Sequence, residues 1–159
     1  MTHYPVPPTS VPRMPSAIAT PGQKLSLPLL LLGTFGVAAA WVLAAVALSS
    51  QCSWMALLAA ADAVVLLQLG GMPPGWRRAG WASAATVATA VLANWGIIAT
   101  QLGMMIGLSP LDSAMRLGAQ LAWTLAQLAN GPADVAWVAT GILLAAALGR
   151  GLSGRRRAP

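Results

Sequence analysis

Four apolar stretches, separated by short polar segments, set the pattern of the chain. They cover residues 27–48, 54–69, 80–107 and 132–149. A helix needs about 20 mainly apolar residues to cross the hydrocarbon core of a bilayer, so each stretch is close to or above that length. One connecting segment reads GGMPPGWRR, and its glycines, prolines and arginines are typical of a water-exposed loop that ends a helix. The pattern predicts an all-α membrane protein with four transmembrane helices.

A fifth stretch, residues 109–130, has a different pattern. Ser109 is placed to cap a helix that has Pro110 at its first position. On a helical wheel the polar side chains share one arc and the leucines lie opposite, which is typical of a helix in the membrane interface. We therefore expect one amphipathic helix at the outer interface. Two alternatives remain open: a fifth span over 109–130, or one long kinked helix over 109–149. The polar arc consists of Asp112, Ser113, Arg116, Gln120, Thr124 and Gln127.

The two ends of the chain lack the apolar pattern. Residues 1–26 are rich in Pro, Ser and Thr and predict a disordered tail, while residues 150–159 form a basic tail. In the four-span arrangement, all nine Lys and Arg residues except Arg116 fall on the side of the two termini. Because cytoplasmic segments carry an excess of basic residues, both termini are predicted to be cytoplasmic, with the membrane domain over 27–149.

Composition narrows the class of protein further. The chain is 57% hydrophobic and 8% charged, whereas soluble domains carry about 25% charged residues. Its single cysteine, Cys52, and single histidine, His3, offer no disulfide, thiol-rich metal site or intramembrane haem ligand. No span pairs a nucleophile with a base, and no nucleotide-binding motif is present. We expect no catalytic residues, no cofactor and no metal.

Many alanines and arginines beside a single lysine are typical of a GC-rich bacterial genome, which favours a bacterial inner membrane. The basic residues are explained by topology and by contact with anionic lipid. We therefore expect the lipid bilayer as a partner, and no nucleic acid.

Asp62 is the most informative residue of the sequence because it places a carboxyl group in the middle of an apolar stretch. Counted from the helix ends, Asn94 and Thr140 come to a similar depth on two other spans. The three residues form the candidate intramembrane polar cluster. In the structural interpretation, an uncharged Asp62 accepts hydrogen bonds from Asn94 and Thr140 and holds the helices in register. In the functional interpretation, Asp62 carries a proton or helps to bind a small solute.

Two functional hypotheses follow. The first is a non-enzymatic scaffold or accessory subunit that binds another membrane protein, or itself as a homo-oligomer. The alternative is a small oligomeric transporter or proton-coupled carrier that uses Asp62. The number of spans resembles that of small four-helix multidrug transporters, but those carry an essential glutamate in the first span, and residues 27–48 contain no acidic residue. The first hypothesis is favoured, since transport usually needs more than one ionisable group.

Overall fold

The computed structural model describes residues 25–107 and 109–151, and this part of the chain is all-α. Most of the two predicted tails lies outside the described residues, although Ser26, expected in the first tail, begins α1. The helix boundaries match the predicted spans closely except that α3 begins four residues earlier than expected, at Trp76. The six helices are α1 (Ser26–Ala47), α2 (Met55–Leu69), α3 (Trp76–Ile106), α4 (Pro110–Arg116), α5 (Ala119–Ala129) and α6 (Pro132–Arg150).

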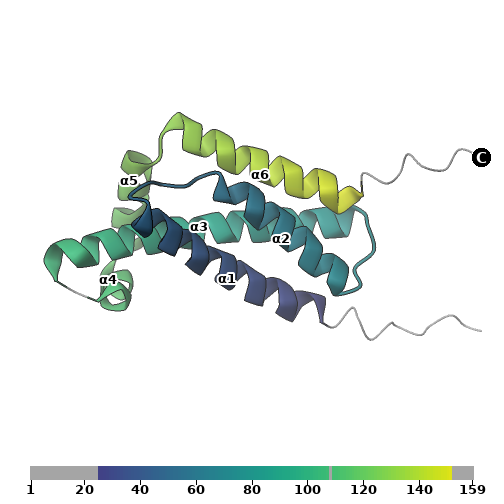
Figure 1. The fold of residues 1–159 in the computed structure, drawn as a ribbon, viewed down its shortest axis with the longest axis horizontal. Helices are drawn as coiled ribbons and strands as arrows, with labels where there is room; N and C mark the ends of the chain where they lie inside the picture. The colour runs from purple at the N-terminus through teal and green to yellow at the C-terminus, as the bar shows by residue number, and fades with distance from the viewer. Residues whose placement is uncertain (1–24, 108, 152–159) are drawn as a thin grey trace, which may run out of the picture.

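Four of these helices, α1, α2, α3 and α6, lie side by side as a bundle (Figure 1). The α2–α3 pair forms its centre, with α1 and α6 packed on opposite sides. The start of α1, the α2–α3 loop and the end of α6 meet at one end, which carries Arg77, Arg78 and Arg150 and is called the arginine end. The α1–α2 loop and the start of α6 meet at the other end, called the amide end for Gln51 and Asn130.

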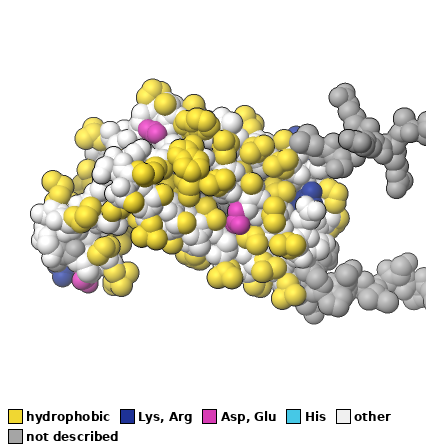
Figure 2. Space-filling view, in the orientation of Figure 1, with side chains coloured by type: hydrophobic (Ala, Val, Ile, Leu, Met, Phe, Trp, Pro, Cys, Tyr) yellow, Lys and Arg dark blue, Asp and Glu magenta, His cyan; other side chains and the backbone are white. Residues whose placement is uncertain are grey.

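Three helices are long and apolar enough to cross a membrane: α1 with 22 residues, α3 with 31 and α6 with 19. Figure 2 shows hydrophobic side chains over most of the visible face, with Lys and Arg side chains towards the ends of the molecule. The multi-pass prediction is supported to this extent. Helix α2 has 15 residues, about 22 Å, which is shorter than a hydrocarbon core of about 30 Å. The fourth span therefore stays a prediction.

The bundle is built mainly from small side chains. Alanines of α2 fill its centre, including Ala56, Ala60 and Ala63, all nearly inaccessible. Gly141 of α6 lies directly on α2, so that a Cβ atom added there would stand 2.7 Å from the carbonyl oxygen of Ala56. In lipid, where helices gain no hydrophobic energy by associating, such close backbone approach supplies much of the attraction.

Helix α3 is longer than the bundle. Gly96 still packs on Val42 of α1, and Ile97 belongs to a core cluster with Cys52 and Met55, so α3 extends beyond the bundle only after Ile97. Helices α4 and α5 pack on this extension. The resulting apolar cluster joins Ile98, Ala99, Leu117 and Ala122.

The single helix predicted over 109–130 is wrong, because the structure divides it into α4 and α5. Leu117 and Gly118 adopt extended backbone angles between the two helices. The break directs Leu117, which is only 4% exposed, into the cluster on the α3 extension. Burial of one leucine stabilises by about 1.5 to 3 kcal/mol, enough to offset the loss of helical hydrogen bonds at a glycine. As predicted, Ser109 caps α4 by accepting a hydrogen bond from the Asp112 N–H.

Candidate functional site

The three residues of the predicted cluster do not meet. Asp62 is the middle residue of α2 and faces α1, where its Oδ2 would stand 2.7 Å from a Cβ atom added to Gly33. It is half-buried and makes no hydrogen bond to any described residue. Thr140 is exposed on α6, and its hydroxyl donates to the Ala136 carbonyl one turn earlier. The expected hydrogen bonds to Asp62 are therefore not found.

Asn94 instead belongs to an amide cluster formed by Gln51, Asn94 and Asn130. The Asn130 Nδ2 donates to Asn94 Oδ1 at 2.8 Å, and Gln51 Nε2 donates to Asn130 Oδ1 at 3.1 Å and to Asn94 Oδ1 at 3.4 Å. The cluster joins the α1–α2 loop, α3 and the α5–α6 link. Each side-chain hydrogen bond within a membrane bundle contributes about 0.6 to 2 kcal/mol, so the cluster holds three separate segments together at the amide end.

Three further hydrogen bonds strengthen this junction. Trp41 is almost fully buried, and its indole N–H donates to the Gln51 carbonyl at 3.0 Å. The Ser53 hydroxyl donates to Asp134 Oδ1 at 2.6 Å, while Asp134 Oδ2 accepts from the Gly131 N–H at 2.8 Å. Asp134 thus sits in the first turn of α6, where a carboxylate interacts favourably with the helix dipole.

The sequence offered only a weak signal for Gln51 and Asn130. Both lie in short polar segments between apolar stretches, where polar side chains usually contact water. What gives them a partner is the position of Asn94, which the length of α3 places at the end of the bundle and not at its middle.

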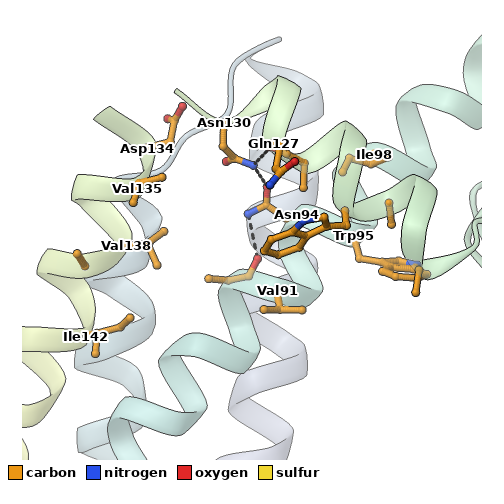
Figure 3. Close-up of a pocket in the computed structure, with 16 residues that line it drawn as sticks. Val91, Asn94, Trp95, Ile98, Gln127, Asn130, Asp134, Val135, Val138 and Ile142 are labelled. Atoms are coloured by element: carbon orange, nitrogen blue, oxygen red, sulfur yellow. Dashed lines mark hydrogen bonds between the residues drawn. The ribbon is translucent and has the colours of Figure 1, made fainter. Parts of the chain in front are cut away.

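A groove of about 730 Å³ adjoins the amide cluster, between α3, α5 and α6. Figure 3 shows Asn94, Gln127, Asn130 and Asp134 gathered on one side, with Val91, Val138 and Ile142 on the apolar walls away from them. Trp95 of α3 and Trp123 of α5 also line the groove. Asp62 lines neither this groove nor the smaller one between α3 and α5.

At the arginine end, Arg78 fastens α6 to the start of α3. It is only 7% exposed, and its guanidinium donates to the carbonyls of Gly149, Leu148 and Met72 at 3.1, 3.3 and 3.4 Å. The first two carbonyls belong to the last turn of α6, where a cation complements the negative end of the helix dipole. Nearby, the Arg150 guanidinium lies 3.9 Å from the centroid of the Trp76 ring.

Within residues 25–107 and 109–151, no group of three or more His, Cys, Asp or Glu side chains could hold a metal ion. The amides of the junction are neutral donors and acceptors, and its one carboxylate is engaged by Ser53 and Gly131. Comparison of the chain with known protein families, with curated proteins and with solved structures gives no match.

Proposed function

We propose that the protein is a non-enzymatic integral membrane subunit that binds another membrane protein through the α1–α2 face. The proposal rests on the surroundings of Asp62. A carboxyl group in the middle of an apolar helix lies half-exposed, with no hydrogen bond to the described part of the chain. Such a group is costly in lipid unless a donor satisfies it.

The geometry around Asp62 fits a partner helix. The Asp62 carboxyl group and the Leu66 side chain both lie over Gly33, where α1 has no side chain, so α1 and α2 approach closely beside the carboxyl group. Leu58 and Val65, one turn before and after Asp62 on α2, are both exposed and apolar. The partner is a transmembrane helix that presents a basic donor at mid-depth. No described arginine of this chain lies at that depth, because all are at helix ends or loops, which favours a different protein over a second copy.

The transporter hypothesis requires Asp62 to reach a water-accessible cavity. The two grooves described above are formed by α3, α5 and α6, whereas Asp62 faces α1. This separation favours the subunit hypothesis.

A photo-reactive amino acid in place of Val65 tests the proposal in living cells. We expect a discrete adduct with another membrane protein after irradiation. Asp62→Leu should lower its yield about 3- to 30-fold, the equivalent of one interhelical polar interaction. Asp62→Asn should lower the yield less, because the amide keeps hydrogen-bonding capacity. The matched control carries the same amino acid in place of Leu143, which is 70% exposed on α6.

Three results would contradict the proposal. Equal yields from the wild-type chain and from the Asp62→Leu variant would show that the carboxyl group does not recognise the partner. An adduct that contains this chain alone would assign the face to a homo-oligomer. An identical adduct from the Leu143 position would show that contact is not specific to the α1–α2 face.

We further propose a bacterial inner-membrane location with both termini in the cytoplasm, which places the arginine end inside. Cys52 is buried and its thiol is a poor reporter, so exposed loop positions are better ones. In spheroplasts of a Cys52→Ser variant, an impermeant maleimide should label Ser50→Cys, in the α1–α2 loop. Pro73→Cys, in the α2–α3 loop, should react only after lysis. The reverse pattern would invert the orientation.

A further inference from the structure

We propose that the groove between α3, α5 and α6 is a binding site for an uncharged single-chain amphiphile, of the chemical class of a monoacylglycerol. The groove lies on the opposite side of the bundle from the α1–α2 face, so this site is independent of the proposed subunit contact. Its volume of about 730 Å³ is within the range of ligand pockets, about 300 to 1,000 Å³.

The apolar part of the groove is long enough for an acyl chain. Its wall on α6 runs from Asp134 to Ile142, which is about 12 Å along the helix axis. Val138 and Ile142 of this wall line the groove together with Val91 and Ile98 of α3, so a hydrocarbon chain laid along it contacts apolar side chains of both helices.

The polar groups of the groove specify the headgroup. The Gln127 amide lines the groove and makes no hydrogen bond to a described residue, so its donor and acceptor are available to a ligand. Asn94 and Asn130 lie beside it (Figure 3). No Lys, Arg or His lines the groove, and Asp134 adds a carboxylate. An anionic headgroup would meet repulsion without a compensating cation, whereas hydroxyl groups can both donate to and accept from the amides.

The orientation of the groove suits an amphiphile in a bilayer. The amides stand at the amide end of the bundle, and the apolar wall of Val91, Val138 and Ile142 leads towards the middle of α6. A headgroup at the amides would therefore lie near the membrane surface, and its chain would point to the bilayer centre.

The test uses the full chain in phosphatidylcholine nanodiscs and a monoacylglycerol with a photo-reactive group in its acyl chain. We expect labelling to concentrate on peptides of α3, α5 and α6 that line the groove. Excess monooleoylglycerol should abolish it, and oleate should compete at least about tenfold less well. Ala139→Phe, which places a ring in the groove, should lower labelling about tenfold or more. The matched control is Ala136→Phe, an exposed position of α6 outside the groove, which should label as the wild type does.

A second variant, Gln127→Leu, keeps the proposal falsifiable if Ala139→Phe fails to fold. Gln127 is exposed, so its replacement should preserve the fold while reducing the preference for monooleoylglycerol over oleate several-fold. The proposal is overturned if labelling spreads evenly over the lipid-facing sides of α1 and α6, or if oleate competes as well as monooleoylglycerol. It is equally overturned if a cross-linker in place of Val135 captures a polypeptide in native membranes.

Discussion

Replacement of Arg78 by methionine is expected to lower the free energy of unfolding by about 3 kcal/mol. The guanidinium is buried and donates to three carbonyls, two of them in the last turn of α6. Methionine has a similar length but no donor, so these carbonyls would remain buried without it. Arg78→Lys should recover only part of the loss, because one ammonium cannot reproduce the planar geometry of three N–H donors. Thermal unfolding in detergent micelles, followed by circular dichroism, measures the change.

The matched control is the neighbouring Arg77→Met. Arg77 carries the same charge next to Arg78 in the sequence, but it is exposed, and its replacement should change the free energy of unfolding by less than about 0.5 kcal/mol. Equal effects of the two substitutions would show that net charge at the arginine end matters and that the contacts of Arg78 do not.

Hydropathy predicted the helices of the bundle well because the length of an apolar stretch is a property of the sequence alone. The limits of α1, α2 and α6 differ from the predicted spans by one residue at most. The break between α4 and α5 was not predicted, although the predicted helix contains Gly118 and a glycine weakens the interior of a helix. Its cause is tertiary: Leu117 gains a buried position on the end of α3, a contact that the pattern of residues 109–130 does not reveal.

The candidate cluster failed for a geometrical reason. Counting residues from helix ends gives depth only if every helix starts at the same height. Gly141 packs on Ala56, and α2 and α6 run in the same direction, so the α6 residue level with Asp62 is near Ala147. Thr140 is thus about 10 Å away along the axis.

The same argument applies to Asn94. Because α3 has 31 residues, its middle lies at the amide end of the bundle and not at the depth of Asp62. The rotation of each helix about its own axis is a second unknown, which is why the contact of Asp62 with Gly33 of α1 could not be predicted.

Substitution of Gly141 should reveal whether the bundle depends on the close approach of α2 and α6. A Cβ atom at this position would stand 2.7 Å from the Ala56 carbonyl oxygen and 3.0 Å from its carbon. Both are backbone atoms, so the two helices must separate to relieve the clash. We expect Gly141→Ala to lower the free energy of unfolding by about 1 to 3 kcal/mol, as overpacking does, and Gly141→Leu to lower it further.

Gly36→Ala on α1 supplies a control with the opposite sign. No heavy atom lies within 4 Å of a Cβ atom added there, and Gly36 is exposed. Alanine in place of glycine in a helix gains about 0.5 to 1 kcal/mol, because the unfolded chain loses conformational freedom. Gly36→Ala should therefore raise the unfolding temperature in micelles while Gly141→Ala lowers it. If both substitutions raise it, α2 and α6 do not approach as closely as the structure shows, and packing of small residues does not hold this bundle together.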